Sequence, residues 1–191
     1  MNHFRNIAVG FAVMWVACDS PPPPVELIPV PIGNLYQVDL PSNLQPGYDM
    51  HAYASLQYYD TLSNFYILGI EDDKANLGEI KRLRLKLRGY FQFVEGTVFG
   101  RVDSLLKEST LEYSFNDDLR VLSGDYYVYN RKWGDDPVFY RLSVYETQDY
   151  FFQIVCWMPY NSHCEAYERL DGITYSFSLI PDKAGTTAGL R

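Results

Sequence analysis

Alternation of apolar and polar residues predicts the first strands of the chain. Residues 35–40 alternate and stop at Pro41, which predicts one strand. Residues 54–60 and 64–71 are rich in aromatic and branched side chains, and a short polar connection separates them. We therefore expect these two segments to form a β-hairpin.

Three later segments also predict strands, at 120–129, 138–146 and 150–158. A three-residue loop separates the last two, which predicts a second hairpin. Both faces of 150–158 are apolar, with Gln153 as the exception. A strand that is apolar on both faces belongs at the centre of a sheet, with packed layers on either side.

Apolar positions three and four residues apart predict the helices. One long or two short helices are expected over 77–108, with Asn76 and Glu79 spaced as a capping box. A last helix is expected from Ser162, with Pro181 closing it. The order of elements predicts an α+β fold, in which a central antiparallel β-sheet is packed between helices on both faces.

The two ends of the chain lack the strand and helix patterns described above. Residues 1–17 combine Arg5 with an apolar run too short to cross a bilayer, so we predict a secretory signal peptide. Residues 18–32 are proline-rich, which favours an extended spacer. We expect residues 33–180 to be the folded domain and residues 181–191 to be a disordered tail.

The junction after the signal peptide points to a lipid anchor. Val16-Ala17-Cys18 resembles the lipobox of bacterial lipoproteins, although Trp15 stands where an aliphatic residue is usual. That resemblance implies acylation of Cys18 with chains such as palmitate, and three chains suffice for stable anchoring to a membrane. The predicted location is the cell envelope, on the outer membrane or at the periplasmic face. A plain secreted protein is the alternative.

Composition and charge exclude some classes of function. The chain is 47% apolar and 16% aromatic, which predicts a folded core. Its formal net charge of −8 opposes nucleic-acid binding, because phosphate recognition needs a basic surface. No acid, base and nucleophile stand in a recognisable motif, so we expect neither an enzyme nor a cofactor.

Several local strings resemble small lipoproteins of Bacteroidota that carry a PsbP-like domain. They are Asp39-Leu40-Pro41, Ala54-Ser-Leu-Gln-Tyr58, Tyr66-Ile-Leu-Gly-Ile70, Tyr150-Phe-Phe-Gln-Ile-Val-Cys-Trp157 and Tyr175-Ser-Phe177. The resemblance implies a PsbP-like sandwich and a non-enzymatic module that binds or scaffolds another envelope component, with a protein as its partner. The alternative is a lipoprotein that binds a small ligand or a glycan through an aromatic sheet surface.

Two groups of residues are candidate sites. Cys156 and Cys164 are close enough in sequence for a disulfide in an oxidising compartment, and two buried thiols are the alternative. Five cations lie within eight residues and form a candidate basic interaction face, with a solvated helix surface as the alternative: Lys81, Arg82, Arg84, Lys86 and Arg88. No catalytic residue or metal site is predicted, because the acidic clusters lack calcium-loop spacing.

Overall fold

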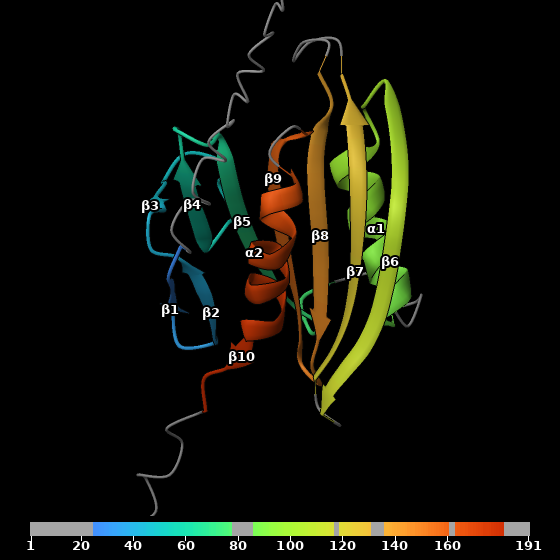
Figure 1. The fold of residues 1–191 in the computed structure, drawn as a ribbon. Helices are drawn as coiled ribbons and strands as arrows, with labels where there is room; N and C mark the ends of the chain where they lie inside the picture. The colour runs from blue at the N-terminus through green and yellow to red at the C-terminus, as the bar shows by residue number, and fades with distance from the viewer. Residues whose placement is uncertain (1–24, 78–85, 117–118, 131–135, 161–162, 182–191) are drawn as a thin grey trace, which may run out of the picture.

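The computed structural model describes residues 25–77, 86–116, 119–130, 136–160 and 163–181. These residues form ten strands and two helices (Figure 1). In chain order they are β1 (Leu27–Ile32), β2 (Tyr36–Pro41), β3 (Gln45–Pro46), β4 (Leu56–Asp60), β5 (Phe65–Asp73), α1 (Leu87–Phe99), β6 (Ser104–Asn116), β7 (Leu119–Tyr129), β8 (Val138–Glu146), β9 (Tyr150–Pro159), α2 (His163–Ser176) and β10 (Ser178–Leu179).

Seven strands form one antiparallel sheet in the order β3-β4-β5-β9-β8-β7-β6. The two predicted hairpins are confirmed as β4–β5 and β8–β9. The central position predicted for residues 150–158 is also confirmed, because β9 lies between β5 and β8. Phe152 and Phe151 of this strand are buried in different core clusters, one on each face.

A second, three-stranded sheet has the order β1-β2-β10. Residues 27–32, which we expected to end the proline-rich spacer, form its edge strand β1. Pro29 and Pro31 are two residues apart, so their missing N–H groups fall on the same side of the strand, at the unpaired edge. Gly33, with φ of 54°, makes the left-handed turn into β2.

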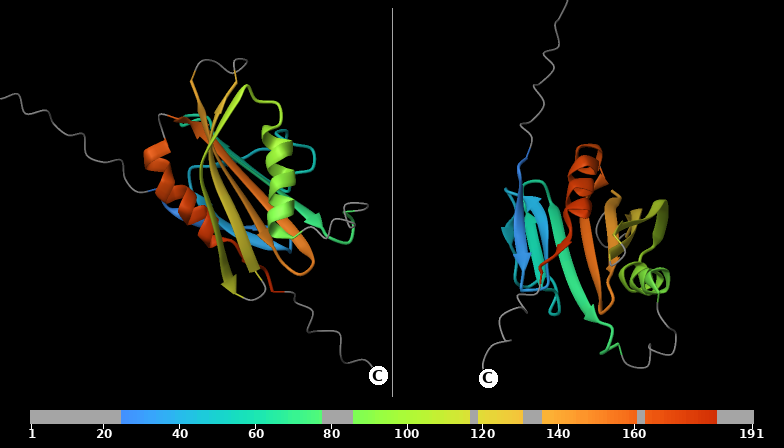
Figure 2. Two further views of the ribbon diagram at one scale, coloured as in Figure 1. Left: turned by 90° about the vertical axis from the view of Figure 1, so that its right-hand side faces the viewer. Right: turned by 90° about the horizontal axis from the view of Figure 1, so that it is seen from below.

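The layers on the two faces of the large sheet differ in kind (Figure 2). α1 packs on β7 and β8. The other face is covered jointly by β2 of the small sheet and by α2, whose Leu170 and Ile173 enter the same core. The predicted α+β fold, with a central sheet packed between helices on both faces, is therefore wrong. The structure is mostly β, and one of its outer layers contains a second sheet.

The prediction of one long or two short helices over 77–108 is tested only in part, because residues 78–85 lie outside the described residues. α1 spans Leu87–Phe99 and buries Leu87, Phe91 and Val94 as the pattern indicated. Residues 104–116 are strand β6 instead, because the chain leaves the helix at Gly100 and pairs with β7. Asn76 lies in a turn after β5, so the predicted capping box does not start this helix. Its N-cap is Lys86, which makes no side-chain capping bond.

A buried ion cluster joins α2 to the sheet. Arg141 of β8 donates from Nε and Nη2 to the Asp125 carboxylate of β7, at 2.7 and 3.0 Å. The same guanidinium pairs with Asp171 of α2. These carboxylates raise the pKa of Arg141 further above its ordinary value, against the opposing effect of burial. The cluster thus fixes α2 against β7 and β8.

Candidate functional site

A row of five aromatic side chains crosses the large sheet on the face that carries α1. Strand register aligns one residue from each of β4, β5, β9, β8 and β7: Tyr59, Tyr66, Trp157, Tyr140 and Tyr126. We call this set the aromatic row. It follows from cross-strand pairing, since side chains directly opposite each other stand on the same face.

The rings of the aromatic row stack mainly on one another. The Trp157 ring lies 5.2 Å from Tyr66 and 6.0 Å from Tyr140, with interplanar angles of 11° and 16°. Because β9 lies between β5 and β8, the two tyrosines occupy opposite faces of the indole. The two faces of the indole are therefore covered, which leaves its edge for contact.

Helix α1 covers only part of this row. Tyr126 is buried beneath it, whereas Tyr66, Tyr140 and Trp157 are half-buried. Two hollows, of about 420 and about 570 Å³, open on the remaining face and share Tyr140 and Trp157. Together they form the groove, and Tyr140 and Trp157 form the ridge across it. Volumes of this size are typical of ligand-binding clefts.

The smaller hollow has an apolar floor and one polar end. Leu68, Ile70 and Val155 belong to its floor. At the polar end the Tyr90 hydroxyl of α1 donates to Asp72, and Gln153 Nε2 donates to that hydroxyl at 3.4 Å. Burial, and then the Asp72 carboxylate, raise the pKa of Tyr90, which keeps the phenol protonated as a donor. Asp72 and Gln153 both line the hollow.

The ridge carries two polar groups without a partner among the described residues. The rings of Tyr140 and Trp157 contact neighbouring aromatic rings. Neither the phenol hydroxyl nor the indole N–H bonds to another described residue. Burial raises the pKa of Tyr140 to about 12, so its hydroxyl is protonated under physiological conditions. Both groups are therefore hydrogen-bond donors, at the point where the two hollows meet.

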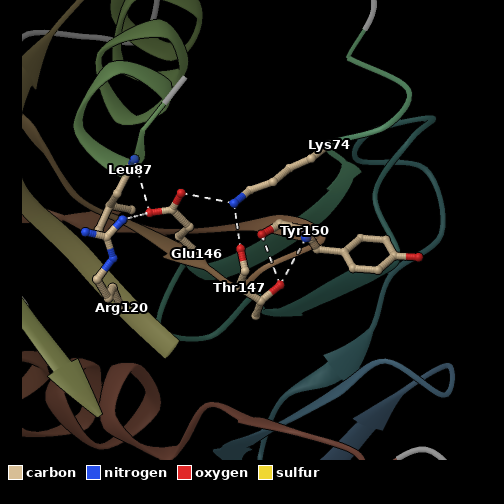
Figure 3. A network of polar contacts seen from close by, with 6 residues as sticks. All are labelled: Lys74, Leu87, Arg120, Glu146, Thr147 and Tyr150. Atoms are coloured by element: carbon tan, nitrogen blue, oxygen red, sulfur yellow. Dashed lines mark hydrogen bonds and ion pairs between the residues drawn. The ribbon is translucent and has the colours of Figure 1, made fainter. Parts of the chain in front are cut away.

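Glu146 holds the N-terminus of α1 (Figure 3). The other end of this helix contributes Thr97 and Val98 to the smaller hollow. Glu146 Oε2 accepts the backbone N–H of Leu87 at 3.3 Å and pairs with Arg120, while Oε1 pairs with Lys74 at 3.0 Å. A carboxylate at this end of a helix is favourable because the first turn has unpaired N–H groups. Glu146 thus takes the place of the missing N-cap side chain.

The candidate basic face is described only in part. Lys81, Arg82 and Arg84 lie outside the described residues, so their grouping stays a prediction. Lys86 is exposed, and Arg88 pairs with Glu112 of β6 at 2.7 Å. Neither of these two side chains lines the groove.

The cysteine predictions remain largely open. Cys156 is a free, buried thiol beside the α2 face of the sheet, and burial raises its pKa to about 12. The side chain of Cys164 is outside the described part of the chain, so the structure gives no support to a bridge, which stays a prediction. Cys18 also lies outside the described residues. No described helix is both long and apolar enough to span a membrane.

Acidic residues form no metal site in the described ranges. No group of three or more His, Cys, Asp or Glu side chains gathers there. Asp72 and Asp73, neighbours in sequence, point to opposite faces of β5, and Asp73 accepts the N–H of Ala75 in a turn. Among the described residues of the groove, the Thr97 hydroxyl donates to the Phe93 carbonyl and makes no hydrogen bond to His51 or Asp72.

The aromatic strands are evident from the sequence, whereas the polar end of the groove is not. In the sequence Asp72 stands between Glu71 and Asp73, and the three form an acidic run. Alternation along β5 places Asp72 on the same face as Tyr66, Leu68 and Ile70, and that signal was available. No local sequence pattern indicates that Tyr90 lies near Asp72, or that the segment with His51 and Tyr53 lines the smaller hollow, because both depend on tertiary packing.

Comparison with known proteins identifies the fold. No protein-family model and no curated protein sequence matches the chain. The cyanobacterial PsbP protein of Synechocystis superposes with a TM-score of 0.61 at 10% identity, covering 86% of this chain and 98% of the other. The Ran-binding protein Mog1p of Saccharomyces cerevisiae gives 0.54 at 11% identity, with 82% and 97% covered.

A third similar structure is LpqN of Mycobacterium tuberculosis, described as involved in cell envelope biogenesis. Its TM-score is 0.50 at 11% identity, with 82% of this chain and 92% of LpqN covered. At these identities the likeness establishes the fold, which is PsbP-like. Function does not follow from fold alone.

Proposed function

We propose that this chain is an exported lipoprotein, anchored through Cys18, whose PsbP-like domain is a non-enzymatic module that binds another component of the cell envelope. One observation carries the binding role: the groove, whose ridge presents two donors that have no partner among the described residues and lie among apolar side chains. Exposed apolar surface with a few oriented polar groups is typical of a recognition site.

The neighbours add weaker support. One is described as binding Ran and another as involved in cell envelope biogenesis, which agrees with a binding role in the envelope. The signal-peptide pattern and Val16-Ala17-Cys18 support export and lipidation.

Site-specific photo-crosslinking in the native cell tests the binding role. A photoreactive amino acid replaces Tyr53, which is 82% exposed and lines the smaller hollow, or Tyr175, which is 50% exposed on α2. We expect a discrete crosslinked product from Tyr53 and none from Tyr175. Equal products from both positions, or none from Tyr53, would contradict the proposal.

Metabolic labelling with a clickable palmitate tests the anchor separately. Wild-type protein should incorporate the label and sediment with membranes, whereas Cys18→Ser should do neither. Equal labelling of the two would remove lipidation from the proposal and leave the binding role to be judged by crosslinking.

A further inference from the structure

We propose that the groove binds an extended polypeptide segment of about six residues, with apolar side chains on both sides of the ridge and a basic residue near Asp72. This inference rests on the proposed binding function and names the chemistry of the partner. It follows from the direction of the groove, the polarity of its two ends and the orientation of the rings.

The groove runs along β9. Alternate residues of this strand face it, from Gln153 in the smaller hollow, through Trp157 in the ridge, to Pro159 in the larger hollow. Six residues of strand correspond to about 20 Å. An extended segment of the same length would lie parallel to β9, and a compact ligand would fill only one hollow.

Spacing along such a segment matches the ridge. Side chains two residues apart in an extended chain are about 7 Å apart and point the same way. Two of them would enter the hollows on either side of Trp157 and Tyr140. The peptide group between them would cross the ridge, where its carbonyl oxygen would accept from the Tyr140 hydroxyl. Such a contact would give an acceptor to a half-buried hydroxyl that has none in the part of the chain that the structure describes.

The two ends of the groove differ in charge. Asp72 is the acidic residue of the smaller hollow, and neither hollow is lined by Lys or Arg among the described residues. Val138, Met158 and Pro159 line the larger hollow instead. A segment with a Lys or Arg at one end and apolar residues at the other matches this polarity, while an acidic segment is disfavoured.

The orientation of the rings disfavours the two other linear ligands. Sugar rings bind aromatic side chains face to face, but Tyr66 and Tyr140 already occupy the two faces of the Trp157 indole. An acyl chain would bury the Tyr140 hydroxyl and the indole N–H without hydrogen bonds, at a cost in affinity. A peptide supplies both apolar side chains and backbone acceptors.

Selection from a phage-displayed library of random dodecapeptides on the purified full-length protein tests the proposal. Peptides that also bind the Trp157→Ala variant are removed. We expect the enriched sequences to share two bulky apolar residues two positions apart, followed or preceded by Lys or Arg. Enrichment of unrelated sequences, or of none, would overturn the proposal.

The affinity of one enriched peptide, measured by fluorescence anisotropy, then tests the ridge. Tyr140→Phe should weaken binding about three- to tenfold, as expected for one lost hydrogen bond. The matched variant Tyr175→Phe, on α2, should leave the affinity unchanged. Asp72→Asn should weaken binding and reduce its dependence on salt. Equal affinity of wild type and Tyr140→Phe would overturn the proposal even if Trp157→Ala fails to fold.

Two competitors complete the experiment. A β-1,4-linked hexasaccharide or palmitic acid that binds wild-type protein and not Trp157→Ala or Tyr140→Phe would overturn the peptide assignment. If crosslinking at Tyr53 succeeds while peptide selection fails, the binding module stands and the extended-peptide partner is wrong. If crosslinking at Tyr53 also fails, the proposed function itself is contradicted.

Discussion

Trp157 and Tyr140 stack across neighbouring strands with their ring centroids 6.0 Å apart, and together they separate the two hollows of the groove. The same stacking that shapes the groove also ties β9 to β8. Tyr66 continues the stack onto β5, at 5.2 Å from the indole. Stability and recognition therefore depend on the same aromatic side chains.

A double-mutant cycle measures the contribution of this stacking to stability. Tyr66→Ala and Trp157→Ala, alone and combined, should show a coupling of about 0.5–1.5 kcal/mol in the free energy of unfolding, because stacked aromatic pairs contribute beyond their buried area. Urea denaturation of the four proteins gives the value. Strict additivity would mean that the two rings do not stabilise each other.

Removing Glu146 should loosen the start of α1. Glu146→Ala takes away the acceptor of the Leu87 N–H and the partner of Lys74 and Arg120. We expect the free energy of unfolding to fall by about 2–3 kcal/mol, with faster hydrogen exchange at the Leu87 amide. Glu112→Ala, which breaks the exposed pair with Arg88, should change stability by no more than about 0.5 kcal/mol. Equal effects of the two substitutions would show that Glu146 does not hold the helix.

Breaking the buried pair of Asp125 and Arg141 should lower the free energy of unfolding more than breaking an exposed pair. Both side chains are 7% exposed, so Asp125→Ala leaves a buried guanidinium without its main partner. The loss should be about 3–5 kcal/mol, and replacing both residues together by Leu and Met should recover much of it. Asp171→Ala should cost less, since that carboxylate is 51% exposed. Thermal and urea denaturation distinguish the variants, and a double variant no more stable than Asp125→Ala would contradict this explanation.

Alkaline pH should destabilise the fold through its buried tyrosines. Burial raises the pKa of Tyr140 to about 12, whereas an unfolded tyrosine titrates near pH 10. Between these values the unfolded chain loses the proton and the folded chain keeps it, so stability is complete below about pH 10 and falls as the pH rises. Tyr36, Tyr90 and Tyr126 have pKa values raised in the same direction.

The Tyr140→Phe variant measures how much Tyr140 contributes to the loss of stability at alkaline pH. It should reduce the slope of unfolding free energy against pH by up to about 1.4 kcal/mol per pH unit above pH 10. Phe99→Leu, which loosens packing against the Tyr140 ring without removing a titrating group, should lower stability at every pH and keep the slope. If the free energy of unfolding falls with pH at the same rate in wild type and in Tyr140→Phe, Tyr140 does not contribute to the loss of stability at alkaline pH.

Sequence patterns predicted the interior of the large sheet better than its margins. Strand β9 was placed correctly because burial on both faces leaves a continuous apolar run. The spacing of Phe99, Val102 and Leu106 by three and four residues is typical of a helix face, so the sequence predicts a helix that runs into the start of β6. An edge strand with exposed Leu106 has little alternation to reveal it.

The candidate site was harder to predict than the sheet. The prolines of β1 disfavour a strand in the sequence pattern. A strand accepts proline at the edge of a sheet, and the sequence does not show which strand lies beside β1. The tyrosine-rich strands were evident, but the alignment of Tyr66, Trp157 and Tyr140 in one row depends on register between strands distant in sequence. Likewise, no local pattern brings Tyr90 of α1 to Asp72 of β5.

Fluorine NMR of full-length protein labelled with 5-fluorotryptophan tests the proposed binding surface most directly. The Trp157 signal is identified by its absence from a Trp157→Phe variant and followed while solubilised native envelope is added. We predict that this signal shifts or broadens with wild-type protein and changes less with Tyr140→Phe, because the partner contacts the ridge. A Trp157 signal that stays unchanged while the protein forms a complex would place binding elsewhere and contradict the central claim.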